Sequence, residues 1–158
     1  LGSGAIMNEV LKAQGMLEKY GVAADVWSVT SYTELRREAL DVERWNMLHP
    51  ASKPRDSYVT KCLGKTKGVV VAASDYMKAL PDGIDKWVPG GLTSLGTDGY
   101  GRSESRAALR DHFEVDARFV VLATLNSLSR KGKVKPELVK KAMKDMKIRM
   151  NKANPYYM

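Results

Sequence analysis

Residues 96–125 constrain the fold more than any other stretch, because a glycine-punctuated loop there runs directly into two helical patterns. Gly96, Gly99 and Gly101 lack a Cβ, so the backbone around them can take positive φ values and turn sharply. The sequence therefore predicts a loop of defined shape followed by two consecutive helices.

The two helices after the loop differ in character. Ser103 is expected to cap the first, which ends near residues 113–114, and Asp116 is expected to cap the second. The second helix has hardly any polar face, which predicts burial against a sheet or a partner chain. Its apolar positions are Phe119, Val120, Val121, Leu122, Ala123, Leu125 and Leu128.

Strand-like and helix-like segments alternate along the whole chain. Short apolar or β-branched runs predict parallel strands at residues 23–29, 69–73 and 92–95. Periodicity and capping residues predict helices at 5–20, 32–46, 57–63, 75–80 and 136–150. The alternation predicts an α/β fold: a three-layer, open, mostly parallel sheet of four to five strands with helices on both faces.

Capping residues and strand ends indicate where a ligand could lie. Ser31 and Glu34 have capping-box spacing, and Asp75 is expected to cap the helix that ends near Leu80. Parallel sheets bind ligands at the carboxyl ends of their strands. The segments expected at that edge are Thr30-Ser31, Ser74-Asp75 and Thr97–Arg102.

A length of 158 residues predicts a single domain over 1–158. The opening Leu-Gly-Ser-Gly resembles the last residue of a strand that runs into a tight turn. We therefore expect a piece of a longer chain, cut at or within that strand.

The net charge of +8 is concentrated at one end. Residues 131–158, a basic helix and tail, hold nine Lys and Arg against two acidic residues, whereas the rest is nearly balanced. That helix carries no aromatic residue on which bases could stack, so nucleic acid is not expected as a partner. The single Cys62 excludes an internal disulfide and suits a reducing cytoplasm. No apolar run approaches the roughly 20 residues that cross a bilayer, so no membrane partner is expected.

Three motifs together resemble one known family. They are GTDGYGRSESRAALRDHFEVDARFVV (96–121), ERWNMLHP (43–50) and ASDYMK (73–78). The chain is similar to the C-terminal, transketolase-type domain of the bacterial homodimeric pyruvate dehydrogenase E1 component. The motifs occur in the expected order and span the chain.

The resemblance implies an oxidoreductase parent that decarboxylates pyruvate on thiamine diphosphate and reductively acetylates a lipoyl group within a multienzyme complex of glycolytic metabolism. It implies that the two preceding domains hold thiamine diphosphate and magnesium, and that this fragment binds neither and is inactive alone. The implied partners are those domains, a second E1 subunit and the acetyltransferase component, which the basic helix could contact. The expected role is structural: Val115–Leu128 and the glycine loop pack on the rest of the parent and support the dimer.

The candidate site is the loop itself. Its residues are Asp98, Tyr100, Arg102, Ser103 and Arg106. They could fix the loop against a neighbouring domain or subunit, bind an anion at the helix start, or reach the active site. A free-standing regulatory domain that binds a small ligand or an anion is the alternative function. No Gly-x-Gly-x-x-Gly follows a strand, so the dinucleotide fingerprint is missing.

Other candidate sites are weaker. Asp98-Gly99 with Asn126 superficially matches a thiamine-diphosphate magnesium motif, but Thr97 replaces its first glycine and Asn126 lies within an apolar helix. His49 and His112 have no neighbouring Ser, Cys or Glu at the spacing of a triad or metal site, and we expect structural roles for both. No catalytic, cofactor-binding or metal-binding residue is predicted.

Overall fold

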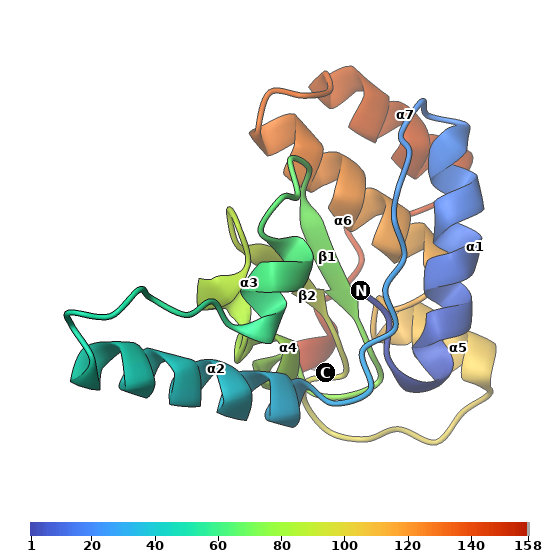
Figure 1. Ribbon diagram of the computed structural model, residues 1–158. Coiled ribbons are helices and arrows are strands. Elements are labelled where there is room, and N and C mark those ends of the chain that lie inside the picture. Colours follow the sequence, from blue (N-terminus) through green and yellow to red (C-terminus); the bar gives the residue numbers. More distant parts are fainter. Residues whose placement is uncertain (158) are drawn as a thin grey trace.

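A small parallel sheet lies between two layers of helices (Figure 1). Strands β1 (Val70–Ala73) and β2 (Leu92–Leu95) pair in parallel, from Val70 opposite Leu92 to Ala73 opposite Leu95. The computed structural model describes residues 1–157. It confirms the predicted three-layer α/β fold, although the regular sheet is smaller than the four to five strands expected.

The missing strands are present as extended segments with little pairing. Gly2 forms parallel bridges to Ser28 on one side and to Ala73 on the other. The strand predicted at 23–29 is therefore wrong as a regular strand, since only Ser28 is bridged. The physical reason is that a strand needs a hydrogen-bonded neighbour. Only Leu1–Ser3 lie between this segment and β1, and they pair with its last residues, so most of residues 22–27 have no strand beside them.

The helices divide between the two faces of the sheet (Figure 1). On one face are the 3₁₀ turn η1 (Gly4–Ile6) and helices α1 (Met7–Glu18), α5 (Arg106–His112), α6 (Ala117–Arg130) and α7 (Pro136–Asp145). On the other are α2 (Tyr32–Leu48), α3 (Tyr58–Leu63), α4 (Ala79–Asp82) and the 3₁₀ turn η2 (Asp85–Trp87). A last 3₁₀ turn, η3, covers Pro155–Tyr157.

Each face of the sheet has its own apolar core. Alternate residues of a strand point to opposite faces, and β1 accordingly places Val70 and Ala72 in one core and Ala73 in the other. The first core joins β1 to α2 and α3, and the second joins it to α1, α6 and α7. Both faces are therefore covered by residues of this chain.

Helix α6 belongs to the core of this domain. Val121 and Leu125 are 0% exposed, and α6 packs on α1, α7 and both strands. Burial against a sheet was one of the two alternatives in the sequence, and it is the one found. The expectation that Val115–Leu128 pack on the rest of a parent chain is wrong for the buried part of that segment, because α1 and the sheet already cover it.

Several helix boundaries test the capping predictions. Ser31 Oγ accepts a hydrogen bond from the Glu34 backbone N–H at 3.2 Å, and Asp116 caps α6 as predicted. Asp75 caps no helix, because residues 75–78 form a turn against the glycine loop and α4 begins only at Ala79. Ser103 caps no helix either: the loop runs two residues further, and Ser105 Oγ accepts from the Ala108 N–H at 3.3 Å.

The basic helix is shorter than predicted. It ends at Asp145, since Lys147 adopts a φ of 55° that breaks the helical path. Within residues 1–157, no helix is both long and apolar enough to span a membrane.

Candidate functional site

The base of the glycine loop is fixed at the carboxyl ends of β1 and β2. The Thr97 N–H donates to the Tyr76 carbonyl oxygen at 2.9 Å, and Thr97 Oγ1 donates to the Asp75 carbonyl oxygen at 2.7 Å. Asp98 Oδ1 accepts from the Lys78 N–H at 3.0 Å, and the Lys78 ammonium lies 3.7 Å from Asp98 Oδ2. Asp98, predicted as a site residue, therefore serves as an anchor between two loops.

Glycine is required at one position in this base. A Cβ on Gly96 would lie 2.4 Å from the Tyr76 carbonyl oxygen and 3.2 Å from the Lys78 N, both backbone atoms. Gly99 has a φ of 91°, which side chains rarely tolerate. Gly96 thus permits the close approach of the 75–78 turn, whereas Gly99 permits the loop's sharp turn near Pro155 and Tyr156.

The substitution Gly96→Ala should therefore lower the free energy of unfolding by about 1–3 kcal/mol, because the added methyl group has no room against backbone atoms. Gly101→Ala is the matched control: nothing lies within 4 Å of a Cβ at Gly101, and its φ is not positive. Urea unfolding followed by circular dichroism measures both. Equal midpoints for the two variants would contradict the assigned role of Gly96.

The rim of the loop faces solvent. Tyr100 is 86% exposed, and Arg102, Ser103 and Arg106 are also exposed. Within residues 1–157, none of these four side chains has a hydrogen-bond or ion-pair partner. The structure thus places Asp98 at the base, Tyr100, Arg102 and Ser103 on the exposed rim, and Arg106 at the exposed start of α5.

A cavity of about 550 Å³ separates the rim from α5. Arg102, Ser103 and Glu104 line it from the loop, and Ala108, Leu109 and His112 line it from the helix. His112 Nε2 is buried and has no hydrogen-bond partner in the described chain. A buried ring nitrogen without a partner loses its hydration without compensation. His112 thus lines the cavity together with Arg102, and its buried Nε2 is unsatisfied in the described residues.

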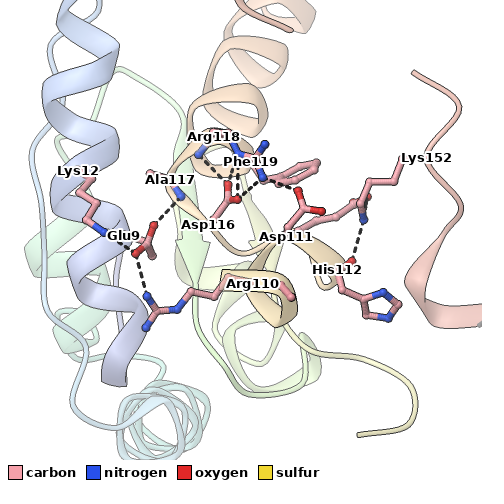
Figure 2. A network of polar contacts seen from close by, with 12 residues as sticks. Glu9, Lys12, Arg110, Asp111, His112, Asp116, Ala117, Arg118, Phe119 and Lys152 are labelled. Atoms are coloured by element: carbon pink, nitrogen blue, oxygen red, sulfur yellow. Dashed lines mark hydrogen bonds and ion pairs between the residues drawn. The ribbon is translucent and has the colours of Figure 1, made fainter. Parts of the chain in front are cut away.

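Ion pairs hold α5 in place behind this cavity (Figure 2). Arg110 bonds to Glu9 of α1 at 2.9 Å, and Asp111 pairs with Arg118 of α6. Lys152 Nζ donates to the His112 carbonyl oxygen at 2.8 Å and to Glu114 Oε1 at 3.1 Å. The His112 ring itself is turned away from these pairs. The helix beneath the rim is thus rigidly attached to three other segments.

Apolar side chains extend the exposed surface from the loop to the neighbouring turn. Tyr76 and Met77 in the turn that carries the loop, and Leu80 in the following helix α4, are large and exposed. Sequence reasoning did not select them, or His112, as site residues. The sequence signal for this exposed apolar surface is the Tyr-Met pair directly after a buried strand. Small polar residues would suffice for a turn at that point.

The weaker candidates are used elsewhere. Asn126 is exposed on α6, and no group of three or more His, Cys, Asp or Glu that could hold a metal ion occurs in residues 1–157. The His49 ring stacks on Trp45 at 4.3 Å, and its Nδ1 lies 2.8 Å from the Trp45 carbonyl oxygen. His49 therefore packs at the end of α2, in agreement with the structural role expected for it.

Comparison with known proteins identifies the relatives of this architecture. The sequence profile described as "Transketolase-like TK C-terminal domain" matches residues 1–116. The chain is 50% identical over 157 residues to the pyruvate dehydrogenase E1 component of Pseudomonas aeruginosa, covering 98% of this chain and 18% of that protein. It is 46% identical over 157 residues to the E1 component of Escherichia coli K12, with the same coverage.

The fold also has a solved counterpart. A split gene transketolase, described as an inactive beta4 tetramer, superposes with a TM-score of 0.53 at 20% identity, over 81% of this chain and 38% of that one. This similarity supports the fold alone. The chain spans less than one fifth of the length of the E1 relatives, so their activity concerns a much longer polypeptide.

Proposed function

The chain belongs to the transketolase-like C-terminal domain family, and from this premise we propose that it is the structural, dimer-supporting C-terminal domain of a pyruvate dehydrogenase E1 component. The parent enzyme would decarboxylate pyruvate on thiamine diphosphate and reductively acetylate a lipoyl group of the acetyltransferase component. Identities of 46–50% over almost the whole chain support this assignment. The proposed location is the cytoplasm.

The cofactor belongs to other parts of the parent in this proposal. Thiamine diphosphate enzymes hold their magnesium with carboxylate and amide oxygens. Here the carboxylate of Asp98 is engaged by Lys78, and Asn126 is exposed on a different element, so these residues do not fit the cofactor. No catalytic step is assigned to residues of this chain.

The rim of the glycine loop carries the proposal of a structural role. Its base is fixed by hydrogen bonds, yet in the described residues the exposed side chains of Tyr100 and Arg102 form no hydrogen bond or ion pair. Tyrosine and arginine are the residue types most enriched among strong interface contacts. A neighbouring domain or a second subunit would bury this rim.

We extend the domain over 1–158, with the basic helix and tail at 131–158 as its last part. Helix α7 packs on α6, and Ala142 and Met146 are buried in the same core as α1. The part of the chain beyond residue 116, where the family match ends, is therefore continuous with the matched part. The exposed lysines of α7 remain available for the acetyltransferase component.

The rim can be tested in the full-length enzyme. Combining Tyr100→Ala with Arg102→Ala should weaken the dimer at least about tenfold, since each truncation removes an exposed anchor. Lys140→Ala with Lys141→Ala, on exposed α7 positions, is the matched control and should leave the dimer unchanged. Sedimentation equilibrium gives both dissociation constants.

Two outcomes of further measurements would contradict the proposal. One is turnover of pyruvate by this chain alone with thiamine diphosphate and magnesium. The other is a dimer that the rim substitutions leave intact while calorimetry shows phosphate binding to the isolated chain that Arg102→Ala abolishes. The second result would favour the anion-binding alternative.

A further inference from the structure

Residues 148–157 lead from the end of α7 to the glycine loop, and we call this segment the strap. It begins with Ile148, which packs against the core formed by α1, α6 and α7. We propose that the strap is a latch for the rim of the loop. Lys152 fastens it to the corner between α5 and α6, its far end supports Gly99, and the rim keeps its shape only while the strap is fastened. The inference goes beyond the proposed function, because it requires neither a second subunit nor enzymatic activity.

Lys152 is a largely buried lysine with several partners. Its side chain is 14% exposed. The ammonium group donates to the His112 carbonyl oxygen at 2.8 Å and to Glu114 Oε1 at 3.1 Å, and it lies 5.4 Å from the centre of the Phe119 ring (Figure 2). A charged group that leaves water requires partners that replace its hydration. These contacts therefore fix the middle of the strap on α5 and α6.

The bond to His112 completes the end of a short helix. His112 is the last residue of α5, and the carbonyl oxygens of a last helical turn have no partner within the helix. A lysine side chain can bond such an oxygen and also interacts favourably with the negative end of the helix dipole. Since α5 has only seven residues, it is too short to be stable alone. The strap thus stabilises the helix that follows the glycine loop.

The corner between α5 and α6 contains a residue in an unusual conformation. Glu114 has a φ of 62°, and the next N–H, that of Val115, donates to the Arg110 carbonyl oxygen at 3.0 Å. Helices that end with this hydrogen bond most often have glycine at the position of Glu114, because side chains rarely tolerate a positive φ. The side chain of Glu114 accepts the bond from Lys152. Glutamate therefore serves a purpose here that glycine could not, which is to hold the strap.

The far end of the strap lies against the glycine loop. A Cβ on Gly99 would lie 3.5 Å from the Tyr156 carbonyl oxygen and 3.6 Å from the Pro155 carbonyl oxygen. Asn154 holds this end in a tight turn, because its Oδ1 accepts from the Tyr156 N–H at 2.9 Å and its carbonyl oxygen from the Tyr157 N–H at 3.2 Å. The loop is therefore in contact with an ordered stretch of backbone.

This contact lies at the point where the loop loses its other support. Asp98, the residue before Gly99, is the last one anchored to the 75–78 turn. In the described residues, the exposed side chains of Tyr100 and Arg102 form no hydrogen bond or ion pair. The strap is thus placed between the fixed base and the exposed rim, where loss of its contact would free the rim and leave the base in position.

Arginine-specific proteolysis of the 158-residue chain tests the proposal, because proteases cut a folded chain where it opens transiently. Lys152→Met keeps a long side chain and removes both hydrogen bonds. Cleavage after Arg102 should become at least about tenfold faster in this variant, since hydrogen bonds to charged groups are among the stronger ones. Lys144→Met is the matched control: this lysine is exposed on α7, its side chain has no bond in the described residues, and the rate should stay unchanged.

Cleavage after Arg44 distinguishes local opening from unfolding of the domain. Arg44 lies within α2, on the opposite face of the sheet from α5 and α6, so cleavage there reports the unfolding of that helix. Its rate should be the same in the unsubstituted chain and in both variants. Circular dichroism verifies that each variant is folded before the protease is added.

Two further variants test the parts of the strap. Glu114→Ala should accelerate cleavage after Arg102 less than Lys152→Met does, because the bond to the His112 carbonyl oxygen remains. Adding Glu114→Ala to Lys152→Met should cause no further increase, since the two residues act through one contact. Asn154→Ala disrupts only the turn of the strap itself. It should also accelerate cleavage after Arg102, and it provides the test if Lys152→Met does not fold.

Two results would overturn the proposal. Unchanged cleavage after Arg102 in folded Lys152→Met or in Asn154→Ala would show that the rim keeps its shape without the strap. Equal acceleration after Arg102 and Arg44 would show that the strap stabilises the whole domain and has no particular effect on the loop. Neither result measures the dimer, so the proposed function could fail separately.

Discussion

Replacing Val121 by aspartate is expected to unfold the chain. Val121 is 0% exposed in the centre of α6, within the core that α6 shares with α1 and α7. A carboxylate there has no partner, and its desolvation costs about 4 kcal/mol or more at neutral pH. That is comparable with the whole stability of a domain of this size, about 5–15 kcal/mol. Far-ultraviolet circular dichroism and urea titration measure the loss.

The matched control is Asn126→Asp on the same helix. Asn126 is exposed, so the same charge there should change the free energy of unfolding by less than about 0.5 kcal/mol. Sedimentation of the Val121→Asp variant separates the two alternatives that the apolar helix left open. A folded monomer from a parental dimer would place Val121 at a subunit contact and contradict its position in the core.

The sequence predicted α6 and its cap correctly because both depend on local signals. Asp116 precedes a long apolar run, and a side-chain oxygen at that point serves the first free amides wherever the helix packs. What covers the helix depends on α1, more than a hundred residues earlier, and the helical pattern carries no information about it. The alternative of a partner chain therefore had to remain open.

The strands show what local sequence signals cannot predict, which is whether a strand has a partner. Residues 92–95 were predicted with their observed bounds, since β2 is a short run between turns and its neighbour β1 is present. Residues 23–29 have equally strong strand propensity, but a strand requires a partner, and only Gly2 reaches Ser28. Propensity describes one segment, whereas a ladder requires two.

The candidate site was predicted in its position but not in its construction. Two of the three segments expected at the carboxyl edge meet there, since Thr97 Oγ1 donates to the Asp75 carbonyl oxygen. The third segment, Thr30-Ser31, forms no hydrogen bond to either of them in the described residues. The unpartnered nitrogen of His112 and the ion pairs that hold α5 involve residues far apart in sequence. Such contacts form only when the chain has folded, so no motif of fixed spacing in the sequence indicates them.

Glu9 is the residue whose role was least visible in the sequence, and its removal should have the second-largest effect. It lies on the apolar face of α1, 6% exposed, where a carboxylate requires partners. Its oxygens accept from Lys12 at 2.9 Å, from Arg110 at 2.9 Å and from the buried Ala117 N–H at 3.1 Å (Figure 2). One side chain thus connects α1 to α5 and to the start of α6.

Glu9→Ala should lower the free energy of unfolding by about 2–3 kcal/mol, mainly because the Ala117 N–H loses its acceptor while buried and Arg110 loses its counter-charge. Glu34→Ala is the control. Glu34 forms an exposed pair with Arg37 within one helix, and such pairs contribute less than about 1 kcal/mol. Urea unfolding at pH 7 compares the two variants, and equal losses would contradict the role assigned to Glu9.

The same difference should depend on pH. Burial alone would raise the pKa of Glu9, but the bonds from Lys12 and Ala117 and the charges of Lys12 and Arg110 hold it below its ordinary 4.5. A carboxyl group with a lowered pKa stabilises the fold above its unfolded pKa and loses this contribution as the pH falls through the folded value. The difference in the free energy of unfolding between the unsubstituted chain and the Glu9→Gln variant should therefore be constant above about pH 5 and become smaller below pH 4.5. A gap that widened on acidification would mean that the carboxylate is destabilised by burial and that its three donors do not compensate.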